Sequence, residues 1–195
     1  MQSVAGRTGK WWAIEHSGVE PDIVCMAKGI ASGMPLGICM SRAEIMDWVP
    51  GSHASTFGGN PISLAAAMAT MDVLEREGID NAASVGAFIL ERLRGWKHSH
   101  PLVGDVRGRG LMIGIELVKD KATREPASAL RNRVEMLAFE KGLMILGCGE
   151  TSLRLCPPLI VSKEEASVAL DILEESLAEV EKEYEREQTP EVVTA

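Results

Sequence analysis

The chain has 195 residues, of which 46% are hydrophobic and 25% are charged, a composition typical of a soluble globular protein. Its formal net charge of -8 at pH 7 argues against a nucleic-acid partner, because binding a phosphate backbone requires a basic surface. No apolar run approaches the roughly 20 residues that span a membrane, and the N-terminal MQSVAGRTGK lacks the apolar core of a signal peptide. We therefore expect a cytoplasmic protein.

The cysteine and histidine spacings predict no metal site. Cys25, Cys39, Cys148 and Cys156 lie in or beside apolar runs, and none forms a CxxC pair. This pattern favours small buried hydrophobic residues over zinc ligands or disulfides. The histidines show no HExxH or other metal-binding spacing.

Residues 1–78 are rich in predicted loops. Short apolar runs bounded by glycine or proline predict two strands, at residues 22–27 and 36–40. Ser41 and Glu44 have the spacing of a capping box, which predicts a short helix that begins at Ser41. Two strands and long polar loops cannot close a core alone, so this part looks incomplete.

The next helix begins at Asn60, because Asn is a good N-cap and the following Pro61 is tolerated at the first helical position. Gly78 predicts its end. The remaining elements are a helix to about Trp96, a strand whose regular part is 111–118, a helix at 129–141, two strands at 143–146 and 153–156, and a final helix after a capping box at Ser162. Residues 79–195 thus resemble a small α+β layer with its own core.

Lys28 lies at the end of an apolar run, in IVCMAKGIASGMPLG, where the chain enters a glycine-rich turn. Burying an ammonium group without a partner is costly, so a lysine here needs a chemical explanation. An uncharged amine condenses with carbonyl compounds, which makes Lys28 a candidate Schiff-base lysine. The alternative is a surface lysine whose aliphatic stem covers the strand end.

The segment STFGGN, residues 55–60, combines hydroxyl groups with glycines directly before a predicted helix. Hydroxyls and unhindered backbone N–H groups at that place can hold a phosphate. Ser55 and Thr56 are therefore candidate phosphate ligands, although the GxxxxGK[ST] spacing of a P-loop is absent. The alternative is a helix cap with a flexible lead-in.

Arg154 lies within the apolar stretch LRLCPPL. A guanidinium group among apolar residues needs an anionic partner, so Arg154 either binds a ligand carboxylate or pairs with one of the chain's glutamates. Arg107 and Arg109, in VRGRG, lie among turn glycines, and there we favour a structural role.

An amine nucleophile, a phosphate-binding segment and a carboxylate-binding arginine are together what a pyridoxal-phosphate enzyme acting on amino acids requires. The sequence resembles the C-terminal half of a class III (ω-type) pyridoxal-phosphate aminotransferase, the group that includes 4-aminobutyrate, acetylornithine and ornithine aminotransferases. It is most similar in character to the 4-aminobutyrate type. The resemblance rests on QSVAGRTGKWWA, PDIVCMAKGIASGMPLG, GSHASTFGGNP, VGDVRGRGLMIGIEL and LRLCPPLIVSKEE, which follow the family's order and span nearly the whole chain.

The resemblance implies a role for each candidate residue. Lys28 would be the Schiff-base lysine and would move a proton between the substrate α-carbon and the cofactor, pyridoxal 5'-phosphate. Gln2 would touch the phenolic-oxygen side of that cofactor. Thr56, with Ser55 beside it, would bind the cofactor phosphate of a neighbouring subunit, and Arg154 would bind a substrate carboxylate.

The fold that the resemblance implies is α/β and of type I. Residues 1–78 would be the C-terminal portion of the large domain that binds pyridoxal phosphate, and residues 79–195 the small C-terminal α+β domain. The enzyme would be a homodimer or a larger homo-oligomer. Its substrates would be an amino acid or amine and a 2-oxo acid acceptor, with no nucleic acid and no membrane as partners.

Parts of the family's site have no counterpart in this sequence. The aspartate that pairs with the pyridine nitrogen would stand three residues before Gln2, and the glycine–serine phosphate loop and the ring-stacking aromatic belong to the N-terminal half. We therefore expect a fragment that does not catalyse transamination by itself, with a separate N-terminal half chain as a candidate partner.

Two other functions stay open. The same scaffold supports racemisation or decarboxylation of amino acids, and a racemase would release neither an oxo acid nor glutamate. The non-enzymatic alternative is a remnant that serves only dimerisation or other interactions.

Overall fold

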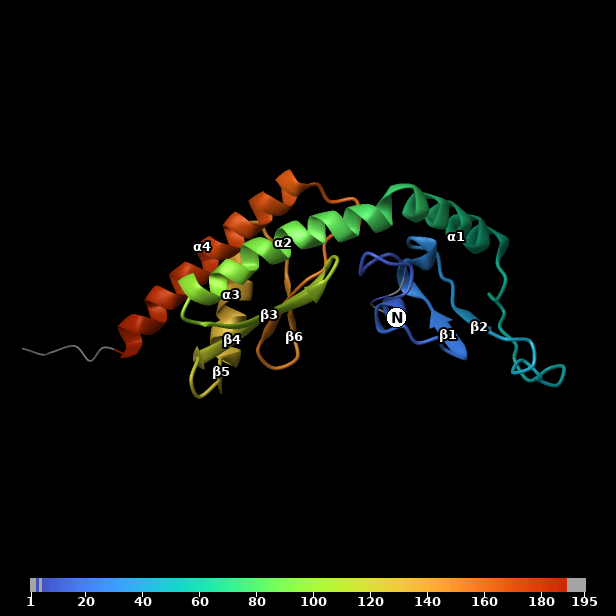
Figure 1. The fold of residues 1–195 in the computed structure, drawn as a ribbon, viewed down its shortest axis with the longest axis horizontal. Helices are drawn as coiled ribbons and strands as arrows, with labels where there is room; N and C mark the ends of the chain where they lie inside the picture. Colours follow the sequence, from blue (N-terminus) through green and yellow to red (C-terminus); the bar gives the residue numbers. More distant parts are fainter. Residues whose placement is uncertain (1–2, 4, 189–195) are drawn as a thin grey trace, which may run out of the picture. The chain divides into compact units, whose positions relative to one another are not determined.

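The computed structural model describes residue 3 and residues 5–188, and the chain divides into two units, Met1–Ala83 and Ser84–Ala195. Each unit has its own sheet and its own set of buried residues. Figure 1 labels most of the helices and strands, which are numbered in chain order.

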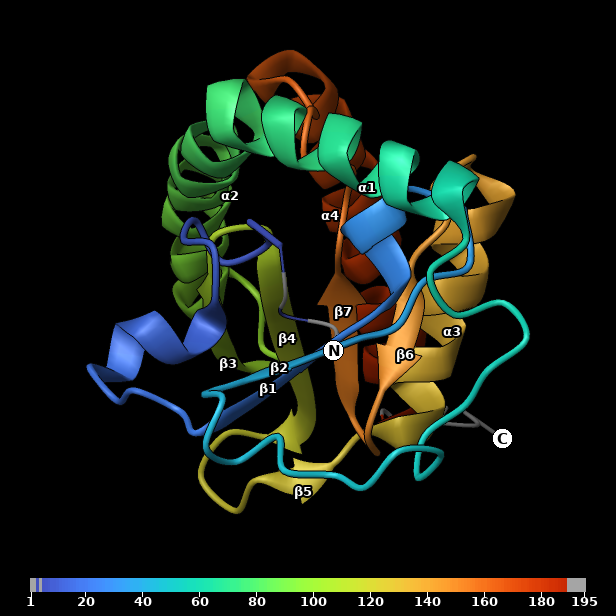
Figure 2. The ribbon, with the colours of Figure 1, turned by 90° about the vertical axis from the view of Figure 1, so that its right-hand side faces the viewer.

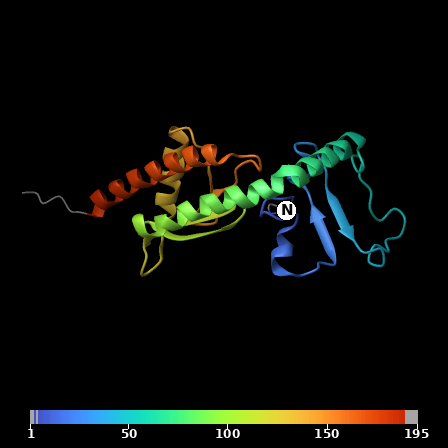
Figure 3. The same cartoon turned by 45° about the horizontal axis from the view of Figure 1, so that its top comes forward.

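The first unit combines a two-stranded antiparallel sheet with one α-helix and three short helices of other types among its described residues. In chain order the elements are η1 (Ala13–Ser17), β1 (Ile23–Met26), η2 (Lys28–Ala31), β2 (Ile38–Ser41), α1 (Pro61–Val73) and η3 (Leu74–Gly78). η1 and η2 are 3-10 helices, and η3 is a π-helix. Strands β1 and β2 are the blue arrows in Figure 3.

The buried residues of the first unit are few and lie mainly between η2 and α1, which pack against each other. Ile30 and Ala31 of η2 are almost completely buried, and Ala67 of α1 is 5% exposed. Met26 and Leu74 add to this small core. Because so little apolar surface is covered within this unit, many of its larger apolar side chains are exposed.

Helix α1 begins as the sequence predicts. The Asn60 side chain accepts hydrogen bonds from the backbone N–H groups of Ile62 (2.9 Å) and Ser63 (3.3 Å), and Pro61 occupies the first helical position. These contacts satisfy two of the donors that a helix start leaves without partners.

The second unit contains a five-stranded antiparallel sheet with helices. Its elements are α2 (Ile79–Ser99, which begins before the unit boundary), β3 (Val103–Arg109), β4 (Met112–Asp120), β5 (Glu125–Pro126), α3 (Ser128–Glu140), β6 (Leu146–Cys148), β7 (Ser152–Leu155) and α4 (Lys163–Gln188). The strand order is β3-β4-β7-β6, and β5 pairs with β4. Figure 2 shows these strands with α3 and α4 beyond them, and α3 contacts β4, β6, β7 and α4.

The core of the second unit follows the predicted periodicities. Ile113, Ile115 and Leu117 alternate along β4 and are almost completely buried. The apolar stripe of α4 is buried at helical spacing, at Ala166, Leu170, Leu173, Leu177 and Val180. Helix α4 begins at the predicted capping box, in which the Glu165 N–H donates to Ser162 Oγ and the Ser162 N–H donates to Glu165 Oε2.

The helix predicted to begin at Ser41 is absent. Ser41 ends β2, where it pairs with Ile23, and its hydroxyl donates to the Asp22 carbonyl at 2.8 Å. Arg42 forms an ion pair with the Asp22 carboxylate. These contacts across the strand pair engage the hydroxyl that a helix cap would have needed, and turns follow instead.

The predicted helix end at Gly78 is also wrong, since η3 and α2 continue the helical path through this residue. Gly78 is buried, and a Cβ atom there would lie 2.9 Å from Leu74 Cδ2. Its lack of a side chain therefore serves close packing and not a left-handed cap.

The segment predicted as one strand with its regular part at 111–118 forms a hairpin. Strands β3 and β4 pair from Arg109 and Met112 outward, and Gly110 takes a positive φ of 53° at the turn. A positive φ at the first residue of a two-residue hairpin turn suits the twist of the paired strands and favours glycine.

The predicted burial of the cysteines is wrong as well, because all four are exposed. Neighbouring residues of a strand point to opposite faces. In β1 the buried residue is Met26, so the adjacent Cys25 lies on the outer face.

Candidate functional site

Lys28 stands directly after strand β1, as its sequence context predicts, and it begins η2. Its φ angle is 60°, a left-handed conformation that non-glycine residues adopt rarely and mostly where function or packing requires it. The preceding Ala27 is extended, so the chain direction changes abruptly at the lysine.

The Lys28 side chain is exposed and lines a hollow of about 490 Å³. Met34, Pro35 and Leu36 give this hollow an apolar wall, and Gly33, with a φ of 102°, lets the chain turn back beside the lysine. Within the described part of the chain, the amine forms no hydrogen bond and no ion pair. The lysine is therefore a free amine at the rim of an open hollow.

Ser55 lies at a second hollow of about 660 Å³, which shares Pro35 and Leu36 with the first. The loop around it turns twice, through hydrogen bonds from the Gly58 N–H to the Ser55 carbonyl (3.2 Å) and from the Asn60 N–H to the Phe57 carbonyl (3.3 Å). The structure thus brings Lys28 and Ser55 to two adjoining hollows of one unit.

Thr56 is exposed in the same turn but lines neither of these two hollows. Its hydroxyl, like that of Ser55, has no hydrogen-bond partner among the described residues. The donors at the start of α1 are taken by Asn60, so the hydroxyls are the groups that this segment offers to an anion. An unpaired amine can bind a carbonyl compound, and unpaired hydroxyls can bind a phosphate.

Arg154 belongs to the second unit and lies on β7, paired with Gly114 of β4 and Leu146 of β6. It is half-buried and lines a mostly apolar hollow of about 300 Å³ between residues of β6, β7 and α4. No carboxylate among the described residues pairs with it, so the internal ion pair that the sequence left open is not found there. The guanidinium group is free to bind an external carboxylate.

Among the residues that the structure describes, Arg107, unlike Arg154, pairs with acidic side chains of its own chain. Its guanidinium group binds Glu116 at 2.6 Å, Asp105 at 3.4 Å and the Ser152 hydroxyl at 3.1 Å. Its pKa is raised, first by the hydrogen bond to Glu116. These contacts support the structural role that we expected for it.

Gln2, the remaining candidate, lies outside the described residues. The described part of the chain holds no group of three or more histidine, cysteine or acidic residues that could bind a metal ion. It also contains no helix with the length and apolar character needed to cross a membrane.

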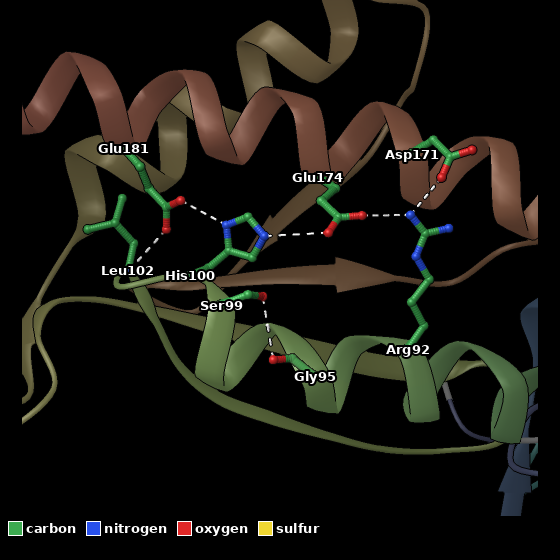
Figure 4. A network of polar contacts seen from close by, with 8 residues as sticks. All are labelled: Arg92, Gly95, Ser99, His100, Leu102, Asp171, Glu174 and Glu181. Carbon is green, nitrogen blue, oxygen red and sulfur yellow. Dashed lines mark hydrogen bonds and ion pairs between the residues drawn. The ribbon is translucent and has the colours of Figure 1, made fainter.

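A buried polar cluster around His100, which directly follows α2, was missed by sequence reasoning. Figure 4 shows the imidazole between two carboxylates of α4: Nδ1 lies 2.8 Å from Glu181 and Nε2 lies 3.6 Å from Glu174. Glu181 also accepts the Leu102 N–H, and Arg92 binds Glu174 at 2.6 Å. Every member is paired, so we interpret the cluster as a structural link between α2 and α4, which run side by side in Figure 3.

Comparisons with known proteins place these residues in a wider context. A family model described as aminotransferase class-III matches residues 1–177. A leucine/methionine racemase of Thermococcus litoralis is 44% identical over 93% of this chain and 41% of its own length. A 4-aminobutyrate aminotransferase of Mycobacterium leprae is 43% identical over 92% of this chain and 41% of its own length.

A solved structure is also similar to this chain. An amine transaminase from an uncultivated Pseudomonas species, in a PLP-bound form, superposes with a TM-score of 0.84 at 36% identity, covering 91% of this chain and 43% of that chain. The chain thus spans about two-fifths of the length of the curated relatives that it matches.

Proposed function

Because this chain belongs to the class III aminotransferase family, we propose that it carries the lysine-bearing part of a transaminase. The enzyme moves an amino group from a primary amine or amino acid to a 2-oxo acid, with 2-oxoglutarate as the acceptor. The structural likeness also confirms the predicted fold class, the C-terminal part of a type I transferase fold. We assign residues 1–78 to its large domain and residues 79–195 to its small domain.

The observation that carries the proposal is the state of Lys28. Its amine is unpaired among the described residues, and its backbone is held in a left-handed conformation at the end of β1. A surface lysine without a function has no reason to occupy a costly conformation, whereas a nucleophile must be presented at a fixed place.

Pyridoxal 5'-phosphate, when bound, withdraws electrons from the substrate carbon and thereby stabilises the charge left by loss of a proton. Lys28 would hold this cofactor through its amine. The same amine would take the proton from the substrate α-carbon and return it, first as a base and then as an acid. Ser55 and Thr56 would hold the phosphate of the cofactor bound by a neighbouring subunit, through their unpaired hydroxyls.

Arg154 orients the substrate by binding its carboxylate. Its support is the absence of an acidic partner in the described residues, together with the mostly apolar hollow that Arg154 lines. Gln2 contacts the phenolic-oxygen side of the cofactor, a role that rests on the resemblance alone.

Thr56 serves the cofactor of a neighbouring subunit, so the working enzyme is a homodimer or a larger homo-oligomer. Its position in the exposed turn before α1 supports this role, since a hydroxyl there can reach a second molecule. The aspartate and the phosphate loop that the family also uses come from an N-terminal portion of the enzyme.

Trapping the cofactor tests the proposal. The chain is mixed with pyridoxal phosphate, reduced with borohydride and digested, and the modified lysine is identified by mass spectrometry. We expect the label on Lys28, its loss in Lys28→Arg and its persistence in Lys10→Arg, which changes another exposed lysine of the same unit. A label spread evenly over the surface lysines would instead favour a non-catalytic interaction module.

A racemase is the second candidate, favoured by the leucine/methionine racemase among the most similar relatives. Product analysis separates the two reactions in a preparation that also contains the N-terminal portion. With an L-amino acid and 2-oxoglutarate, a transaminase yields glutamate and a new oxo acid. A racemase yields the D-amino acid and no glutamate.

A further inference from the structure

Two cysteines face each other in the strand pair that leads to Lys28. In the antiparallel register of β1 and β2, Cys25 is the direct partner of Cys39. Both are exposed, and both are free thiols. The buried neighbour, Met26, pairs with Ile38 and lies on the opposite face, so the two thiols share the outer face of the pair.

The strand geometry suits a covalent link between them. Directly opposed residues of an antiparallel pair have Cα atoms about 4.5–5.5 Å apart. A disulfide requires Cα atoms about 4.4–6.8 Å apart, so the strands need not separate or shift register to form one.

The two thiols also interact electrostatically. Loss of hydration raises the pKa of the Cys39 thiol, and its hydrogen bond with Cys25 and the repulsion between the two groups raise it further. A raised pKa leaves less of the Cys39 thiol as the reactive thiolate at neutral pH, and raising the pH to 9 increases that share.

We propose that Cys25 and Cys39 form an intrachain disulfide under oxidising conditions. The bond would link β1 and β2 covalently and so make the strand pair that leads to Lys28 sensitive to redox conditions. The inference is independent of the proposed function, since it rests on strand register and thiol chemistry alone.

The oxidant is a low-molecular-weight disulfide such as oxidised glutathione. One protein thiolate attacks a sulfur of the oxidant, the sulfur–sulfur bond breaks, and one glutathione leaves as its thiolate. The second cysteine then attacks the protein sulfur of this mixed disulfide and releases the other glutathione. Two protein thiols are oxidised, and one oxidised glutathione is reduced to two molecules of glutathione.

The bond would close a ring that contains the candidate site. Residues 25–39 include Lys28, all of η2 and the wall of the hollow beside the lysine. Cross-linking the two ends of this segment removes conformations in which they separate. Oxidation therefore restricts the backbone that presents the lysine.

Peptide mapping tests the proposal on the full chain. The reduced chain is incubated with oxidised glutathione at pH 7 and at pH 9, the remaining thiols are alkylated, and trypsin is added. Cleavage after Lys28 separates peptide 11–28, which holds Cys25, from peptide 29–42, which holds Cys39. We expect these two peptides to be joined, Cys25 and Cys39 to be neither alkylated nor glutathionylated, and the reaction to be faster at pH 9.

Single variants make the result specific. Cys25→Ser and Cys39→Ser should each stop at the mixed disulfide and keep one glutathione at the remaining cysteine of the pair. The double variant Cys148→Ser/Cys156→Ser changes the other two exposed cysteines and should still form the linked peptide. The proposal fails if Cys25 and Cys39 each retain glutathione, stay alkylatable, or link to another cysteine or another chain.

Discussion

At the scale of single residues, the candidate site combines backbone strain with unpaired side chains. Lys28 holds a left-handed φ of 60°, a conformation that costs a side chain with a Cβ atom about 1–2 kcal/mol. Natural proteins keep such residues where the surrounding structure imposes the conformation, and these places are often functional.

We predict that Lys28→Gly is more stable than Lys28→Ala by up to about 1 kcal/mol, because glycine removes the strain while its greater freedom in the unfolded chain offsets part of the gain. Urea denaturation followed by circular dichroism measures the difference. Lys10 is the matched control: it has no left-handed φ, so there the alanine variant should be the more stable one. The argument is contradicted if the glycine and alanine variants have the same order of stability at position 28 as at position 10.

Two arginines of the second unit should respond differently to the loss of charge. Arg154 has no carboxylate partner among the described residues, so Arg154→Met should leave the free energy of unfolding unchanged or raise it. Arg107→Met removes the partner of Glu116 and should lower the free energy of unfolding. The loss should be less than about 1 kcal/mol, because the pair is half-exposed. Chemical denaturation of both variants checks the difference, and a larger loss for Arg154→Met would disprove it.

At the scale of secondary structure, α2 shows how one helix uses two glycines for different reasons. A Cβ atom on the buried Gly86 would lie 2.2 Å from the Gly110 carbonyl oxygen, so this helix and the β3–β4 turn touch backbone to backbone. Gly95, in the same helix, has nothing within 4 Å of such an atom.

Alanine at these two positions should therefore have opposite effects. Gly86→Ala forces the turn away and should destabilise the chain by about 1–3 kcal/mol. Gly95→Ala gains helix propensity without a clash and should stabilise it by up to about 1 kcal/mol. Thermal unfolding of the two variants against the parent chain gives the sign of each effect, and stabilisation by Gly86→Ala would refute the backbone contact.

At the scale of the whole molecule, ion pairs couple stability to acid pH. Burial alone would raise the pKa of Asp105, but the hydrogen bond and charge of Lys97, with contacts from Val106 and Arg107, lower it below the ordinary value of 3.8. Since the folded-state pKa lies below the unfolded-state value, this stabilisation is complete above about pH 4 and is lost as the pH falls through the folded-state pKa.

Asp105→Asn should accordingly lower the stability at neutral pH and make it depend less on pH below about 4. Lys97→Met removes the first partner of the same carboxylate and should flatten the profile in the same way. Denaturation midpoints collected from neutral to acid pH provide the comparison. If the parent and both variants share one acid profile, the Lys97–Asp105 pair does not contribute.

The sequence by itself determined the features that depend on a few neighbouring residues. Asn60 and Ser162 predicted two helix starts, and the apolar stripe of α4 predicted its buried face, because caps and helical periodicity act within one or two turns. The motif around Lys28 indicated the family, which the comparisons confirm. The roles of Lys28 and Arg154 stay predictions for the experiments above.

Only the tertiary structure decided which residues meet across long stretches of chain. It opposed Cys25 to Cys39, set His100 against Glu181, and turned Gly78 from an expected helix end into a packing position. It also left Arg154 without an acidic partner in the described residues, although the chain is rich in glutamate. Strand register and helix packing settle such contacts, and both follow from the burial of many side chains at once, which no local pattern specifies.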